Sequence, residues 1–217
     1  MTDALLRAGF RFDPGDPAHR RSANESRYTI YRLPYEPLSH GQGALRPEIQ
    51  IEAAVWPLRR PAVELQVSSF VAEAFERPAE VRNIACVSVT QTAAEKFVAL
   101  TRRTAAEMAG AGGPRDPTLA RHIYDLHVIR AHYDVAEVAA MARVIMPHDA
   151  AVFGNQFPAY RADPLTETLR AVEALATDPR YGQRYADFQR DMVYGNQPRY
   201  EDALQTISAL AEELEGH

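Results

Sequence analysis

The sequence predicts an α+β fold in which a small antiparallel sheet is followed by a helical bundle. Two observations lead to this expectation. Residues 27–35 and 48–56 alternate apolar and polar side chains, as half-buried strands do, whereas apolar residues recur at helical spacing from about residue 90 onward. We therefore expect an α+β lobe over residues 1–110 and a helical lobe over residues 111–217.

The amino-terminal elements follow from local signals. The segment ALLRAGF resembles the end of a helix, and residues 13–26, rich in Pro, Gly, Asp and Ser, are typical of an exposed loop. A Gly-rich turn over residues 39–47 joins the two alternating runs, which indicates an antiparallel hairpin. In the second run, Glu48, Gln50 and Glu52 share one face and Ile49, Ile51, Ala53 and Val55 share the other.

The elements that follow alternate between helix and strand. Residues 67–76 have helical spacing and stop before Arg77-Pro78. The apolar run over residues 84–89 predicts a short buried strand, in which Cys86 is a small buried hydrophobe. Thr90 stands at a position suited to an N-cap, and the helix that it opens continues to Met108. After the Gly-rich linker GAGGPRDP, the sequence predicts helical segments over about 117–133, 134–147, 148–155, 163–177, 180–193 and 199–214.

Composition excludes several classes of protein. The chain has 217 residues, a net charge of −5 and a single cysteine, so it forms no intramolecular disulfide and has no Cys-x-x-Cys metal site. It shows no signal peptide and no apolar run long enough to span a membrane, which predicts a cytoplasmic protein. Phosphate-binding loops of the GxxxxGK[ST] type, GxSxG and GxGxxG are absent from the sequence.

Lys96, in the stretch QTAAEKFVALTRR, is the only lysine of the chain, whose other basic side chains are all arginine. Lys96 and Arg103 share one face of the predicted helix, seven residues apart. A lysine ammonium acts as a point charge and an arginine guanidinium as a two-pronged donor, and together they can bind a triphosphate. The alternative is a solvated helix face on which these charges have no function.

Two further positions carry candidate chemistry. Glu52 lies on the polar face of its strand, where a carboxylate can hold Mg²⁺ if the face opens on a cleft; a solvated strand face is the alternative. In the segment RHIYDL, Asp125 is spaced to meet Arg121 or His122 on one helix. Such a partner would keep Asp125 ionised and oriented towards a substrate, unless the pair is an ordinary surface contact. Leu119, Ile123, Leu126 and Tyr133 form the core face of this helix.

Three stretches in this order, LRPEIQIEAA, TAAEKFVALTRR and RHIYDL, resemble the AbiEii/AbiGii nucleotidyltransferase family, the toxin half of type IV toxin–antitoxin and abortive-infection systems. The resemblance covers roughly residues 25–205. It implies a nucleotidyltransferase-like α+β lobe and a helical lobe, with a nucleoside triphosphate and Mg²⁺ in a cleft between them. Residue by residue, Glu52 matches a metal-binding carboxylate, Lys96 the triphosphate-contacting lysine and Asp125 a catalytic aspartate. Arg103, Arg121 and His122 are the further candidates for nucleotide binding.

The same resemblance implies transfer of a nucleotide from the triphosphate to an acceptor, with tRNA as the expected acceptor and an antitoxin as the expected protein partner. The family pattern begins with a Gly-Ser or Gly-Gly turn and an Asp-x-Asp strand, and the sequence contains no Asp-x-Asp. We therefore expect a truncated nucleotidyltransferase-like sheet that is inactive alone. A misassigned start, a separate amino-terminal half or a degenerate remnant would each account for the missing motif.

Two other functions remain open from the sequence. The first is a non-catalytic nucleotide- or RNA-binding regulatory module of the same fold. The second is a helical interaction protein. Residues 136–217 carry 13 acidic and 7 basic side chains, so the carboxy-terminal part could dock a basic partner.

Overall fold

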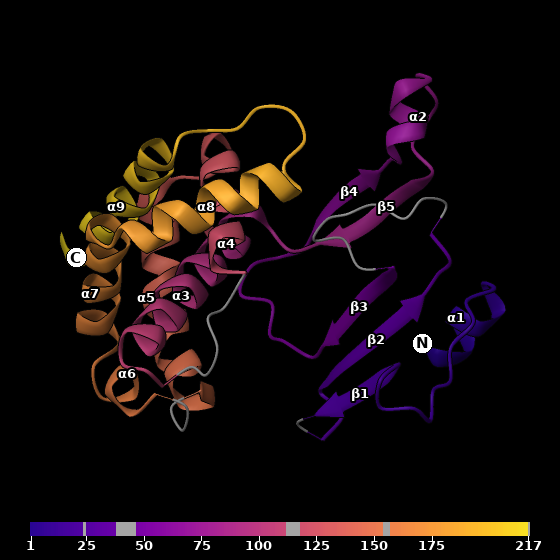
Figure 1. Ribbon diagram of the computed structural model, residues 1–217, viewed down its shortest axis with the longest axis horizontal. Coiled ribbons are helices and arrows are strands. Elements are labelled where there is room, and N and C mark those ends of the chain that lie inside the picture. The colour runs from indigo at the N-terminus through magenta and orange to yellow at the C-terminus, as the bar shows by residue number, and fades with distance from the viewer. Residues whose placement is uncertain (24, 38–46, 112–117, 154–156, 217) are drawn as a thin grey trace. The chain divides into compact units, whose positions relative to one another are not determined.

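The computed structural model describes residues 1–23, 25–37, 47–111, 118–153 and 157–216. It divides into two compact units, Met1–Pro57 and Leu58–His217, and each is considered by itself. The predicted α+β class is confirmed, because antiparallel strands precede a large set of helices (Figure 1). No helix within the described ranges is long and apolar enough to cross a membrane.

The first unit is a three-stranded antiparallel sheet with a short amino-terminal helix, α1 (Thr2–Arg7). Its strands are β1 (Arg20–Ala23), β2 (Tyr28–Pro34) and β3 (Glu48–Ala54), in the order β1-β2-β3. The predicted pairing of the two alternating runs is therefore confirmed, with Ile30 opposite Glu52. The expected loop over residues 13–26 is partly wrong, because β1 forms within it and pairs with β2. Most of the expected turn, residues 38–46, lies outside the described residues.

One face of β2 is buried, and the amino-terminal segment covers it. Thr29, Tyr31 and Leu33 are buried while their neighbours are partly exposed. The Tyr31 ring meets Phe12 edge-on, and its hydroxyl lies 3.3 Å from the Thr2 hydroxyl. The sheet is thus held from one side by residues that precede it in the sequence.

The second unit begins with a two-stranded hairpin, β4 (Val63–Val67) and β5 (Val81–Cys86), joined by the short helix α2 (Phe70–Ala74). β4 was not predicted, and the expected helix over residues 67–76 is shorter because Ser69 caps it. The predicted strand over 84–89 forms earlier and is exposed rather than buried. Cys86 is only partly exposed, so its expected full burial is also wrong.

The helices of the second unit surround α3 (Val89–Met108), which packs against α4, α5 and α7. Ser88 caps α3 by accepting a hydrogen bond from the backbone N–H of Gln91 at 3.2 Å. The expected cap, Thr90, lies inside the helix. The other helices are α4 (Leu119–Val128), the 3₁₀ turn η1 (Arg130–His132), α5 (Val135–Phe153), α6 (Pro158–Ala162), α7 (Pro164–Thr177), α8 (Pro179–Met192) and α9 (Tyr200–Gly216).

The core lies among these helices, and packing in it explains why one helix boundary differs from the one that the sequence predicts. The predicted core positions Leu119, Ile123 and Leu126 lie on α4 and are buried in the main apolar cluster. Tyr133 is buried in the same cluster but lies beyond α4, because the helix expected over residues 117–133 ends at Val128 and a 3₁₀ turn follows it. The helix expected to end at Pro147 instead continues to Phe153. Proline normally ends a helix, but Met146 and Ala150 on either side of it are buried, and this packing keeps α5 continuous.

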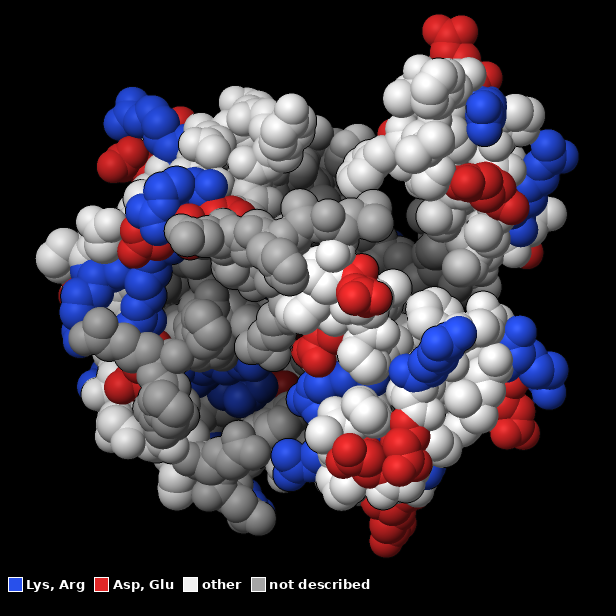
Figure 2. Space-filling model, turned by 45° about the vertical axis from the view of Figure 1, so that its right-hand side comes forward, with Lys and Arg blue, Asp and Glu red and all other residues white. Residues whose placement is uncertain are grey.

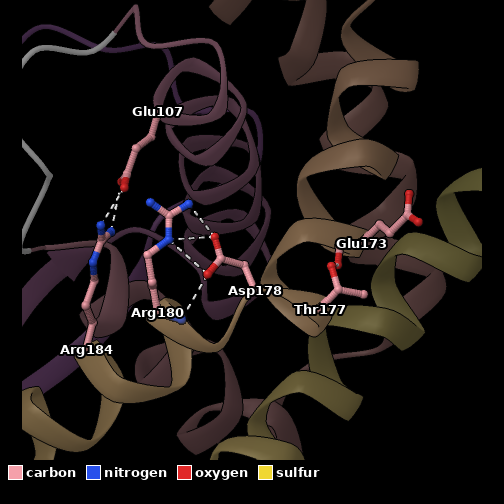
Figure 3. Close-up of polar contacts among 6 residues, drawn as sticks. All are labelled: Glu107, Glu173, Thr177, Asp178, Arg180 and Arg184. Carbon is pink, nitrogen blue, oxygen red and sulfur yellow. Dashed lines mark hydrogen bonds and ion pairs between the residues drawn. The ribbon is translucent and has the colours of Figure 1, made fainter.

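An ion pair ties α8 to α3 (Figure 3). Arg184 of α8 donates to both carboxylate oxygens of Glu107 of α3 through Nη1 and Nη2, with Nη1–Oε2 at 2.9 Å. At the start of α8, Asp178 accepts a hydrogen bond from the Arg180 backbone N–H at 3.0 Å. Hydrogen bonds from the Arg180 guanidinium, together with this capping contact, lower the pKa of Asp178 to about 2.

Candidate functional site

Two helices bring Lys96 and Asp125 together. Lys96 lies on α3 and Asp125 on α4, and Lys96 Nζ donates to Asp125 Oδ2 at 2.6 Å. The side chains retain 27% and 28% of their exposure, so solvent and small anions can reach the pair. The sequence singled out both residues, and their direct contact is a finding of the structure.

Arg103 continues this line of polar groups two turns further along α3. Its Nη1 donates to Thr118 Oγ1 at 2.9 Å and lies 3.2 Å from His122 Nε2. A guanidinium can only donate, so Nε2 of His122 is the acceptor in this contact. The arrangement therefore places a cation next to an imidazole on the same two helices that carry the lysine–aspartate pair.

The expected partner of Asp125 is wrong. The spacing on α4 pointed to Arg121 or His122, but Asp125 pairs with Lys96 and His122 lies against Arg103. The reason is tertiary, because α3 packs along α4 and presents Lys96 directly to the carboxylate. Arg121 is exposed and lies beside Asp125 at the edge of a pocket.

That pocket was not foreseen from the sequence. Its volume is about 250 Å³, and its walls come from α4, α8 and the two residues that follow α8. The lining residues are Arg121, Tyr124, Asp125, Phe188, Met192, Val193 and Tyr194. The cluster of apolar and aromatic residues in FQRDMVYGN was a usable signal, but only the packing of α8 on α4 shows which of them meet Asp125.

Glu52 belongs to the first unit, on β3. Tyr28 Oη donates to its Oε2 at 2.8 Å and Gln50 Nε2 to its Oε1 at 2.6 Å. Partial burial and the neighbouring Glu52 raise the pKa of Tyr28. Both carboxylate oxygens thus already have donors, and the described part of the chain contains no group of three or more His, Cys, Asp or Glu side chains that could hold a metal ion.

A second ion pair crosses the bundle at greater depth. Arg102 Nε donates to Asp149 Oδ2 at 2.6 Å, and these side chains keep only 12% and 9% of their exposure. The Arg102 guanidinium also lies 4.0 Å from the centre of the Phe153 ring. Burial raises the pKa of Asp149, and the charge of Arg102 offsets part of that rise. This pair joins α3 to α5 and was not anticipated.

The surface charges are mixed. On the face drawn in Figure 2, acidic and basic side chains are interspersed among the described residues rather than gathered by sign. This face therefore presents no broad basic surface to a polyanion.

Comparison with known proteins gives one positive result. A family model described as nucleotidyl transferase AbiEii toxin, type IV TA system, matches residues 2–206. No match was found among curated proteins or among solved structures. The matched range extends over most of both units and includes every candidate site residue named above.

Proposed function

This chain belongs to the family of AbiEii nucleotidyltransferase toxins of type IV toxin–antitoxin systems, and from that premise we propose that it binds a nucleoside triphosphate on the α3–α4 face and takes part in nucleotide transfer. The observation that carries the proposal is the contact between Lys96 and Asp125 at 2.6 Å beside the Arg103–His122 contact. The family further implies an antitoxin as a protein partner.

The cations of this face suit a triphosphate. Lys96 supplies a compact ammonium and Arg103 a planar donor group, and Arg121 adds a second guanidinium on α4. His122 accepts a hydrogen bond from Arg103 and so helps to hold that guanidinium in place. In the unliganded chain Asp125 neutralises Lys96. A phosphate oxygen that displaces this carboxylate gains the ammonium as its partner, so binding of the triphosphate and pairing with Asp125 compete for the same nitrogen.

Asp125 is the proposed catalytic carboxylate. Once Lys96 binds phosphate, Asp125 is released beside the nucleotide and can accept the proton of an attacking hydroxyl. That oxygen forms a bond to the α-phosphorus, the bond to the β-phosphate oxygen breaks, and pyrophosphate leaves with its charge neutralised by the cations. The proposed acceptor is a tRNA.

Nucleotidyl transfer commonly uses divalent metal ions that bridge phosphate oxygens. Glu52 could offer one carboxylate to Mg²⁺, but both its oxygens accept hydrogen bonds and the described residues hold no cluster of metal ligands. The described residues therefore do not by themselves form a metal-binding site. We propose that the chain has no transferase activity alone and that a second chain supplies the further carboxylates.

Calorimetry tests the binding proposal directly. Nucleoside triphosphate is titrated into the wild-type chain and into Lys96→Ala, Lys96→Arg and Arg199→Ala. Arg199 is a matched control because it carries one positive charge in an exposed ion pair with Glu201. Lys96→Ala should weaken binding about tenfold or more, the size expected for a lost charge-assisted contact, and Arg199→Ala should leave it unchanged. Equal binding by all four proteins would exclude Lys96 as a phosphate contact.

A second candidate function is a nucleotide- or RNA-binding module that performs no transfer. The lack of an Asp-x-Asp motif in this sequence favours such a non-catalytic module. A transfer assay with triphosphate labelled at the α-phosphate separates the two functions when the chain is supplied with its antitoxin, its neighbouring gene products and total tRNA. Label that appears on tRNA and is lost in Asp125→Asn supports transfer, whereas binding without any labelled product supports the module.

A further inference from the structure

The pocket lies beside Asp125 and shares Arg121 with the cations proposed to bind phosphate. Asp125 lines the pocket and also contacts Lys96. A ligand group in the pocket is therefore next to the residue that marks the phosphate end of the site. The three lining residues from α4 and the four from α8 and the segment after it all lie within the second unit.

The pocket walls are suited to a flat aromatic group. Tyr124 and Phe188 meet edge-to-face, with ring centres 5.7 Å apart and planes at 61°. Tyr194 is fully exposed and Met192 is 38% exposed, so a ligand in the pocket can contact both side chains. Aromatic rings and a polarisable thioether are the partners on which nucleobases stack. Arg121 adds donors for the ring nitrogens or carbonyl oxygens of a base.

Size limits what the pocket can hold. Pockets for drug-sized ligands usually measure about 300–1,000 Å³, and this one measures about 250 Å³. It can hold a base, with or without its ribose, but not a whole nucleoside triphosphate. The rest of such a ligand must leave the pocket, and the Asp125 edge leads it to Lys96.

We propose that the pocket formed by Tyr124, Phe188, Met192 and Tyr194 is the subsite for the nucleobase of the triphosphate. This inference rests on the proposed function, because it assumes that the phosphates lie at Lys96. It assigns recognition of the base to α8, the segment after it and the neighbouring side chains of α4, and recognition of the phosphates to Lys96 and Arg103 of α3.

The test compares two probes, a nucleoside triphosphate and inorganic tripolyphosphate, the second of which has no base. Calorimetry is run on the wild-type chain with each of ATP, GTP, CTP and UTP, and with tripolyphosphate. The variants are Tyr194→Ala and Met192→Ala, whose exposed side chains can be removed without disturbing the core, and Phe188→Leu. Phe70→Ala is the matched control, since Phe70 is 91% exposed and lies on α2.

Tyr194→Ala should weaken nucleoside triphosphate binding about tenfold, the loss expected for one base-stacking ring, and leave tripolyphosphate binding unchanged. Lys96→Ala should weaken both probes, and Phe70→Ala neither. The subsite is overturned if the pocket variants bind nucleoside triphosphate as the wild type does, or if they lose both probes equally. A wild-type chain that binds neither probe overturns the proposed function itself. If the pocket variants bind like the wild type while Lys96→Ala weakens both probes, only the base subsite is overturned and the phosphate site is retained.

Discussion

Two ion pairs of equal length have different consequences because they differ in burial. Lys96–Asp125 and Arg102–Asp149 both measure 2.6 Å. The first is more than a quarter exposed, so its net stabilisation is small and an incoming anion can replace the carboxylate. The second is nearly buried, where an unpaired charge would be costly. The accessible pair is thus the functional candidate and the buried pair is structural.

Asp125→Asn separates binding from stability. The substitution removes the carboxylate that competes for the Lys96 ammonium, so we expect tripolyphosphate to bind at least as tightly as to the wild type. The free energy of unfolding should fall by no more than about 1 kcal/mol, as for other exposed pairs. Calorimetry and urea denaturation measure the two quantities. Weaker tripolyphosphate binding would show that Asp125 positions Lys96 rather than competing for it.

The buried carboxylate predicts a pH dependence. Burial raises the pKa of Asp149 above its ordinary value of 3.8, so the folded chain holds this proton more tightly than the unfolded chain. Its contribution to the free energy of unfolding is therefore largest below pH 3.8 and falls as the pH rises through the raised pKa.

Denaturation of the wild type and Asp149→Asn at a series of pH values between 3 and 7 isolates this contribution, because asparagine does not titrate. We expect the wild-type stability, measured relative to the variant, to decrease as the pH rises above 3.8. A relative stability that increases with pH would mean that the attraction of Arg102 outweighs burial and lowers the pKa of Asp149.

The sequence identified single residues better than their partners. Lys96 stands out as the only lysine, and Asp125 belongs to a recognisable segment. The i, i+3 and i, i+4 spacings on one helix suggested Arg121 and His122 as partners, but a residue 29 positions away takes that place. Such a contact depends on how α3 and α4 pack, and the same holds for the pocket formed by α4 and α8.

At the scale of elements, apolar runs predicted strands without predicting their burial. The run ending in Cys86 reads as a core strand, yet β4 and β5 form a two-stranded hairpin whose residues are mostly exposed. Val63, Leu65 and Val67 each keep more than 40% of their exposure. A run of apolar residues shows that a segment can be buried. Whether it is buried depends on which other elements pack against it.

The start of α3 gives a prediction at this scale. Ser88 accepts a hydrogen bond from the Gln91 backbone N–H, so Ser88→Ala should lower the free energy of unfolding by about 1 kcal/mol. Ser88→Asp keeps an acceptor at the cap and adds a charge that the helix N-terminus favours, so it should retain the stability. Urea denaturation followed by circular dichroism measures both. Equal losses in the two variants would contradict the capping role.

At the scale of the whole molecule, the chain consists of a sheet unit and a larger unit that holds the helical bundle. The predicted division into an α+β lobe over residues 1–110 and a helical lobe over residues 111–217 stays a prediction. In the larger unit, α3 is surrounded by helices from later in the sequence. Local spacing predicted most of these helices, but it could not show that α3 is their centre.

The same division predicts how the chain can be cut. Residues 58–217 hold the main apolar core together with Lys96, Arg103 and Asp125. We expect this fragment to unfold cooperatively and to bind tripolyphosphate with the affinity of the full chain. Circular dichroism and calorimetry provide the measurements. Loss of tripolyphosphate binding in a folded fragment would assign phosphate contacts to residues 1–57.

The central claim is that Lys96 exchanges Asp125 for a phosphate, and the sequence offers a direct way to observe it. Because Lys96 is the only lysine, protein labelled with ¹⁵N,¹³C-lysine gives NMR signals from this one side chain. We predict that its side-chain signal moves in Asp125→Asn without ligand, and moves saturably in the wild type on titration with nucleoside triphosphate. A signal that stays unchanged while calorimetry records binding of the triphosphate would contradict the account.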